Sequence, residues 1–166
     1  MVPGKEGGYS KHYPSGDEGS VLDIAMRYKD EGVPLVVVGG KLYGTGSSRD
    51  WAAKGSLLLG VKAVIVESFE RIHRSNLIGM GVLPLQFKDG QGRASLKLDG
   101  SETWDFTGLK SGIETGMDVA AKITRADGSS EDITLLCRID TLDEVEYFRH
   151  GGILQFVLRK LMKEAA

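Results

Sequence analysis

Cysteine, long apolar runs and any excess of one charge are all scarce in this sequence. Cys137 is the only cysteine in 166 residues, which excludes intrachain disulfides, zinc ribbons and a cysteine-ligated iron–sulfur cluster built by this chain alone. The longest apolar run, residues 33–38, is far too short to cross a bilayer. The first 16 residues lack the apolar core of a secretory signal. The residues therefore predict a cytoplasmic protein without a membrane partner.

The charges nearly balance. Lys and Arg number 21 against 23 Asp and Glu, for a net charge of −2, whereas nucleic-acid-binding domains usually carry a strong basic excess. The three histidines, His12, His73 and His150, are scattered and have no metal-ligand spacing. Neither a strong nucleic-acid site nor a metal site is predicted.

Glycine, by contrast, is abundant. The chain has 23 glycines, about twice the average share of ~7 %, so we expect many tight turns and some close approaches of backbone to a ligand. With 41 % apolar and 27 % charged residues, the composition is globular. A chain of this length suits one compact domain. We predict a single domain over residues 1–166, with residues 1–19 as an extended arm.

The first half of the chain predicts alternating helices and strands. Residues 20–29 have apolar side chains at helical spacing behind an N-cap at Ser20. Residues 33–39 are a largely β-branched run, typical of a strand covered on both faces. The elements expected next are a helix from Asp50 to Gly60, a strand at 62–66, a helix capped by Ser68 and a strand at 84–87. This order favours parallel strands joined by crossover helices.

The second half predicts mostly antiparallel strands. Residues 93–98 alternate apolar and polar, as a half-buried strand does, and we expect residues 103–106 to pair with them. Residues 118–124 and 131–136 flank the strongest hairpin signal. Thr141 opens a capping box, and residues 153–162 form an amphipathic helix with a solvated outer face. Together the two halves predict an α/β fold.

One glycine-rich loop, residues 44–50, carries chemistry. Its two glycines permit close backbone approach, and the helix that starts nearby directs unpaired N–H groups at the same place. The result is an anion pocket. Ser47, Ser48 and Arg49 add donors suited to a carboxylate, which arginine grips with two parallel bonds.

A purely structural loop remains an alternative, because caps and turns account for most Ser and Gly in such places. The loop has no third glycine for GxGxxG, no Lys-Ser/Thr pair for a P-loop and no GxSxG elbow, so nucleotide binding and serine-hydrolase chemistry are disfavoured. Trp51, just after the loop, is expected to anchor its helix in the core. Cys137, inside a predicted strand, is expected to be a buried hydrophobe.

Two long segments add a resemblance. GKLYGTGSSRDWAAKG at residues 40–55 and LGVKAVIVESFERIHRSNLIGMGVLPL at residues 59–85 closely resemble the C-terminal swivel domain of aconitases, in the branch with bacterial aconitase A and the iron-regulatory proteins. MVPG at residues 1–4 and TRADG at residues 124–128 look like flanking parts of the same domain. The resemblance implies a swivelling β/β/α three-layer domain with mixed sheets and flanking helices.

The resemblance also implies roles. The family interconverts citrate and isocitrate through cis-aconitate, a reaction of the tricarboxylic acid cycle, at a [4Fe–4S] cluster. Ser47 falls where the family places its catalytic base, and Ser48 and Arg49 fall at positions that hold substrate carboxylate. Cys137 matches no cluster ligand, so the cluster is expected on other domains and none is expected on this chain. We therefore expect cluster-bearing domains and a tricarboxylate substrate as partners, and an isolated chain without activity.

Two other functions stay open. The chain could be a separately encoded small subunit of a related hydro-lyase, of the isopropylmalate or methylcitrate type. It could also be a non-catalytic module, since some members of the resembled family bind messenger RNA; its near-neutral charge allows weak RNA binding at most. His73 lies in a polar stretch that faces either the cluster domains or solvent.

Overall fold

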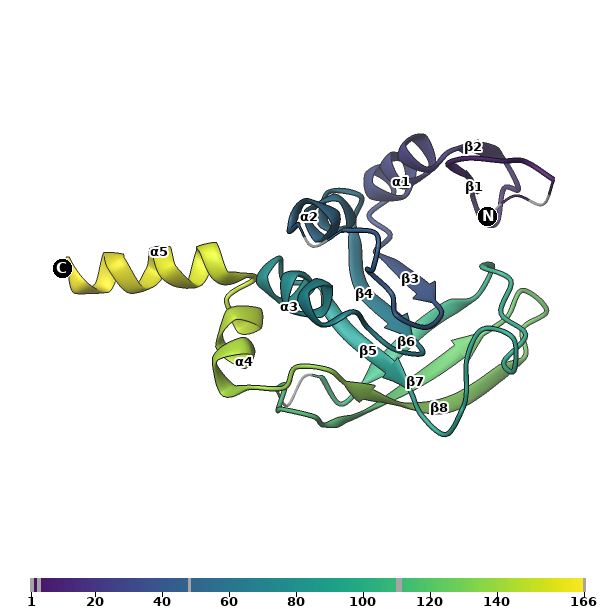
Figure 1. The fold of residues 1–166 in the computed structure, drawn as a ribbon. Helices are drawn as coiled ribbons and strands as arrows, with labels where there is room; N and C mark the ends of the chain where they lie inside the picture. The colour runs from purple at the N-terminus through teal and green to yellow at the C-terminus, as the bar shows by residue number, and fades with distance from the viewer. Residues whose placement is uncertain (1, 3, 48, 110–111, 166) are drawn as a thin grey trace.

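The computed structural model describes residues 2, 4–47, 49–109 and 112–165 (Figure 1). The strands found there are β1 (Tyr9–Lys11), β2 (Glu18–Ser20), β3 (Leu35–Gly39), β4 (Val61–Val66), β5 (Leu83–Phe87), β6 (Thr103–Thr107), β7 (Asp118–Thr124) and β8 (Ser130–Cys137). The helices are α1 (Val21–Asp30), α2 (Trp51–Leu58), α3 (Arg71–Gly79), α4 (Leu142–Arg149) and α5 (Ile153–Glu164). The predicted α/β class is confirmed.

Six strands form one mixed sheet in the order β3-β4-β5-β8-β7-β6. The first three are parallel, with Val64 of β4 paired to Val37 on one side and to Pro84 on the other. The remaining pairings are antiparallel. The predicted change from parallel to antiparallel pairing along the chain is thus confirmed, as is the hairpin that joins β7 to β8.

Three layers result, because the sheet curls and its antiparallel half folds under its parallel half (Figure 1). Ile65 of β4 packs between the two halves, in a core cluster with buried side chains of β5, β7 and β8. Its neighbours Val64 and Val66 point to the opposite face, as alternation along a strand requires, and pack with Ala53 of α2 and Leu77 of α3. The predicted β/β/α layering is confirmed, with one curled sheet supplying both β layers.

Residues 93–98 form turns, so the predicted strand there is wrong. The Leu96 amide donates to the Gly92 carbonyl (3.1 Å) and the Leu98 amide to the Arg93 carbonyl (3.0 Å). These backbone bonds are local, within residues 92–98, and do not join a neighbouring strand. Leu96 and Leu98 are nevertheless buried, and this burial explains the alternation that resembled a strand. The expected partner, β6, pairs with β7 instead.

β3 packs on both faces as predicted, with Val36 and Val38 against one core cluster and Leu35 and Val37 against the other, but this cover is incomplete. All five of its residues are half-buried, because β3 is the edge strand of the sheet and has a strand neighbour on one side only. A run of β-branched residues shows that a strand forms, but its place in the sheet depends on pairings made far along the chain.

The N-terminal arm contains a small hairpin that the sequence did not predict. β1 and β2 pair antiparallel, with Tyr9 opposite Ser20. Ser20 also caps α1 as predicted, since its hydroxyl accepts a hydrogen bond from the Asp23 amide (3.1 Å). His12 is buried there between Ser15 (2.8 Å) and Glu31 (3.0 Å). The arm is thus held by its own side-chain contacts as well as by backbone pairing.

α4 and α5 end the chain. The Thr141 hydroxyl accepts a hydrogen bond from the Glu144 amide (3.2 Å), which confirms the predicted cap of α4. α5 then runs away from the rest of the molecule to the C-terminus (Figure 1). In the part of the chain that the structure describes, no helix has the length and apolar character needed to cross a membrane.

Candidate active site

The glycine-rich loop ends the connection from β3 to α2, residues 40–50, and this connection is hydrogen-bonded to the segment just before α3. The Tyr43 amide donates to the Ser68 carbonyl (2.9 Å), and the Leu42 amide donates to the Ser68 hydroxyl (2.8 Å). Ser68 therefore holds the loop, and its predicted role as the α3 cap is wrong. Glu70 is the cap instead, because its carboxylate accepts a hydrogen bond from the His73 amide (2.8 Å).

His73 supports the loop from inside the molecule. Its side chain is only 3 % exposed, so both readings of the sequence, a domain-facing and a solvated histidine, are wrong. The imidazole lies edge-on to the Tyr43 ring, with centroids 5.3 Å apart, and occupies the space where a Cβ on Gly44 would lie. Burial lowers the pKa of His73, against a weaker opposite effect of Glu70, so the ring is neutral at pH 7.

The Gly44→Ala variant should displace this loop. A Cβ at residue 44 would lie 2.3 Å from His73 side-chain atoms, and the backbone there has φ +102°. Overpacking and strain of this kind cost roughly 1–3 kcal/mol of stability, measurable by urea unfolding. Gly46→Ala is the matched control, because a Cβ there meets nothing within 4 Å and the backbone is not left-handed. Equal losses in the two variants would contradict the fitted role of Gly44.

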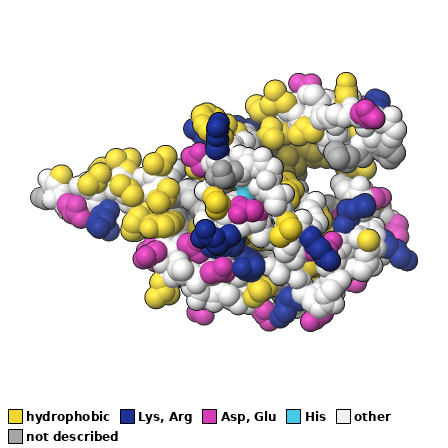
Figure 2. All heavy atoms as spheres, viewed as in Figure 1, with side chains coloured by type: hydrophobic (Ala, Val, Ile, Leu, Met, Phe, Trp, Pro, Cys, Tyr) yellow, Lys and Arg dark blue, Asp and Glu magenta, His cyan; other side chains and the backbone are white. Residues whose placement is uncertain are grey.

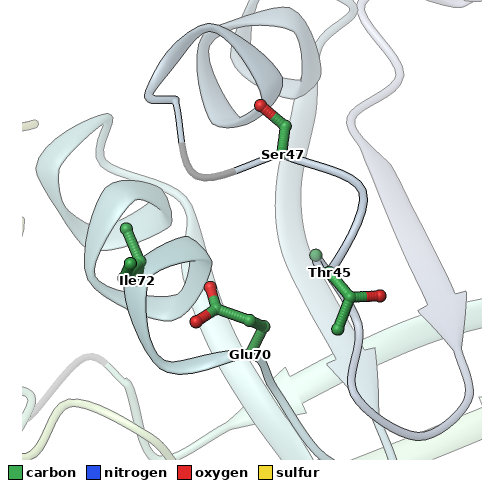
Figure 3. A pocket seen from close by; sticks show the side chains of 5 residues that line it. Thr45, Ser47, Glu70 and Ile72 are labelled. Carbon is green, nitrogen blue, oxygen red and sulfur yellow. The ribbon is translucent and has the colours of Figure 1, made fainter.

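An open cleft of about 200 Å³ lies between the loop and the start of α3. Gly44, Thr45 and Ser47 line it from the loop, and Glu70 and Ile72 line it from the other side (Figure 3). Ser47 is half-buried, and its hydroxyl oxygen accepts a hydrogen bond from the Arg49 amide (3.1 Å). A fixed backbone donor of this kind stabilises negative charge on an oxygen atom.

Arg49, two residues after Ser47, is exposed. No ion pair of its guanidinium is found among the described residues, so its five N–H donors are available to an anionic ligand. Of the three predicted residues, Ser47 lines the cleft and the backbone amide of Arg49 lies next to the Ser47 hydroxyl, while the predicted roles of both side chains stay predictions. Ser48, the third predicted residue, lies outside the described residues.

Glu70 is a residue of the cleft that sequence analysis missed. Hydrogen bonds from the His73 and Ile72 amides lower the pKa of its carboxyl group, so Glu70 is ionised at neutral pH and makes one wall of the cleft negative. This charge disfavours an anionic group directly next to that wall of the cleft. The only signal in the sequence was an acidic residue in the first turn of the helix predicted to follow Ser68.

Trp51 was predicted to anchor α2 in the core, and this prediction is wrong. Its side chain is 65 % exposed and packs under the Lys54 ammonium group, 4.4 Å from the ring centroid. Ala53 is the fully buried residue of this helix. The prediction failed because the size of a residue does not tell which side of a helix faces the sheet.

Cys137 and its neighbours do not fit an iron–sulfur cluster. The side chain is fully buried in the core between the two sheet halves, as predicted, and burial raises the pKa of the thiol. A raised pKa disfavours the thiolate that a cluster ligand requires. Within the described ranges, no three His, Cys, Asp or Glu residues are grouped so that they could hold a metal ion.

Known proteins resemble the chain over this same region. A family model described as the aconitase C-terminal domain matches residues 1–90, which include the loop, the cleft and α3. The chain belongs to the aconitase C-terminal domain family. The predicted family is therefore confirmed, and the match includes both long segments that suggested it, residues 40–55 and 59–85.

Individual aconitase relatives extend the likeness to nearly the whole chain. Aconitate hydratase A of Pseudomonas aeruginosa is 60 % identical over 162 residues, covering 98 % of this chain and 18 % of the relative. The Escherichia coli aconitate hydratase A is 55 % identical over 163 residues, again 98 % and 18 %. The chain thus spans less than a fifth of the length of these relatives.

A solved structure shows the same aconitase-type fold. A 3-isopropylmalate dehydratase from Methanocaldococcus jannaschii superimposes with a TM-score of 0.53 and 21 % sequence identity, over 89 % of this chain and 82 % of that one. At this identity the likeness supports the three-layer fold and carries no information about substrate.

Proposed function

We propose that this chain is the swivel domain of an aconitate hydratase, a hydro-lyase that interconverts citrate and isocitrate through cis-aconitate. The observation that carries the proposal is the position of Ser47. Ser47 lines an open cleft, its hydroxyl accepts a hydrogen bond from the Arg49 amide, and the Arg49 side chain is exposed. Membership in the aconitase C-terminal domain family supports the same assignment.

Ser47 is the proposed catalytic base. Its hydroxyl is a poor base in water, so the alkoxide form needs fixed donors and a site from which water is excluded. The Arg49 amide is one such donor, and the Arg49 guanidinium adds a positive charge nearby. In the proposed reaction the Ser47 oxygen takes a proton from a substrate carbon, and Ser48 and Arg49 hold the substrate carboxylates.

The rest of the reaction needs parts that this chain does not supply. Because the residues here do not fit a [4Fe–4S] cluster, we place the cluster of the complete enzyme on other domains of the same polypeptide. We also propose that this enzyme works in the cytoplasm. Those domains would also close the cleft, which is open to solvent on one side in the isolated chain. We therefore expect no turnover from this chain alone.

Arg49→Lys tests the binding role in the complete enzyme. An ammonium group cannot reproduce the forked contact of a guanidinium with a carboxylate, so KM for the tricarboxylate should rise by about tenfold, the equivalent of about 1.4 kcal/mol. The assay follows the ultraviolet absorbance of cis-aconitate. Arg93→Lys, at an exposed turn residue, is the control and should leave KM unchanged. An unchanged KM in Arg49→Lys would remove Arg49 from substrate binding.

A further inference from the structure

α5 presents an apolar stripe that its own chain does not cover. None of its residues is buried, and Figure 2 shows hydrophobic side chains along the length of the projecting helix. Most of this surface comes from four leucine and methionine side chains, each more than half exposed: Leu154 73 %, Leu158 60 %, Leu161 56 % and Met162 64 %. A contiguous exposed patch of this kind marks an interaction site.

The base of α5 is fixed, so the direction of the helix is part of the fold. A Cβ on Gly152 would lie 2.6 Å from the Gly79 carbonyl oxygen, and one on Gly81 would lie 2.7 Å from the Gly151 carbonyl oxygen. Only glycine fits at these two positions. The Arg159 guanidinium also donates to the His150 carbonyl (2.7 Å). These contacts hold α5 at a set angle to α3 and α4.

The stripe faces away from the body of the domain. Phe156 packs edge-on against Tyr147 of α4, with ring centroids 5.2 Å apart, and Arg159, three residues later on the same side, bonds to His150. Leu154, Leu158 and Leu161 share one face, because they are three and four residues apart. Each is two or five residues from Phe156, which places that face on the opposite side of the helix. The domain could cover these three leucines with its own residues only by breaking the contacts of Phe156 and Arg159.

A second copy of the chain is a poor occupant for the stripe. The helix has 12 residues, about 18 Å of length, and so offers fewer than two heptads where a stable coiled coil needs three or four. A larger surface must meet it. The rest of a longer polypeptide can provide such a surface. The matched segment is 98 % of this chain but only 18 % of aconitate hydratase A from Pseudomonas aeruginosa.

We infer that the apolar face of α5 is the surface through which this domain docks onto the remaining domains of the same aconitase polypeptide. The inference rests on the proposed function in one respect, that the chain works as one domain of a larger hydratase. The occupant is an apolar surface of those domains, which would shield the stripe from water. Docking through a rigid helix outside the cleft would leave the cleft free to open and close.

The test compares the accessibility of α5 in the isolated chain and in the complete enzyme. Cysteine is introduced at Leu158, on the stripe, or at Lys163, on the opposite side, as Leu158→Cys and Lys163→Cys. Labelling by a maleimide is followed over time, and mass spectrometry of the peptides separates these sites from every other cysteine. Both positions are exposed, so neither substitution should disturb folding, which circular dichroism checks.

In the isolated chain we expect both sites to react at similar rates, at every protein concentration. In the complete enzyme Leu158→Cys should react at least tenfold more slowly, while Lys163→Cys changes less than threefold. Equal rates for Leu158→Cys in the two proteins would overturn the inference. Concentration-dependent protection in the isolated chain would overturn it too, in favour of a second copy.

Labelling does not depend on turnover, so it separates this inference from the proposed reaction. The complete enzyme carrying Ser47→Ala should show the same protection of Leu158→Cys. If Ser47→Ala kept full activity and the protection remained, the role of Ser47 would fail and the docking surface would stand. If the protection were absent and Ser47→Ala were inactive, the docking surface alone would fail.

Discussion

Replacing Ser47 with alanine in the complete enzyme is expected to lower kcat by about 10²- to 10⁴-fold, the usual contribution of a positioned proton-transfer group. Ser47 lines the cleft, and its hydroxyl oxygen has a fixed backbone donor 3.1 Å away. KM should change little, because Arg49 and the cleft walls remain. Steady-state kinetics give both constants, and calorimetry of tricarboxylate binding to the inactive variant checks that substrate still binds.

Ser56→Ala is the matched control for this result. Ser56 lies on α2, and its hydroxyl donates to the Ala52 carbonyl (3.4 Å), so the variant removes a serine hydroxyl outside the cleft. We expect full activity from it. The comparison also tests the structural alternative, in which Ser47 only orders the start of α2. In that case Ser47→Ala would lower the unfolding temperature of the chain and leave kcat near the wild-type value.

Glu144→Ala should destabilise the domain strongly, although it lies outside the site. Glu144 receives two hydrogen bonds from the Arg74 guanidinium, of 2.8 and 3.0 Å, which connect α3 to α4. Arg74 is only 8 % exposed. Removing the carboxylate leaves a buried positive charge with a weaker partner, Asp140 at 3.4 Å. Breaking a buried pair in this way costs about 3 kcal/mol or more, measurable by urea unfolding.

Glu146→Ala is the control on the same helix. Glu146 pairs with Arg149 at 2.9 Å, and both side chains are about half exposed. Exposed pairs contribute about 0–1 kcal/mol, so the loss should be small. A loss for Glu144→Ala no larger than that for Glu146→Ala would mean that the Arg74 contact adds no more than an exposed pair.

The same pair makes stability depend on pH. Burial works to raise the pKa of Glu144. The hydrogen bond and charge of Arg74, together with backbone hydrogen bonds from Asp140 and Thr141, outweigh it, and the net pKa lies below the ordinary value. A carboxyl group with a lowered folded pKa stabilises the protein above its unfolded pKa, about 4.3. That contribution disappears as the pH falls through the lower, folded pKa. The difference in stability between wild type and Glu144→Ala should therefore shrink below about pH 4.

The glycine-rich loop was predictable from sequence in part. The glycines, the hydroxyls and Arg49 indicated an anion pocket, and the family resemblance suggested the role that we propose for Ser47. The opposite wall was not predictable, because Glu70 and Ile72 lie more than 20 residues further on. Tertiary hydrogen bonds bring them to the loop, such as those that join Tyr43 to Ser68 and Glu70. His73 shows the same limit, since a polar stretch of sequence contains a buried ring.

By itself the sequence determined the elements whose causes are local. Ser20, Thr141 and the hairpin at residues 125–129 act over a few neighbouring residues, and such interactions do not depend on the rest of the fold. Tertiary structure decided which surfaces are covered. It placed β3 at an edge, left Trp51 in solvent, turned residues 93–98 back on themselves and directed α5 away from the domain. Hydrophobicity alone cannot assign these positions, because burial depends on what packs against a residue from elsewhere in the chain.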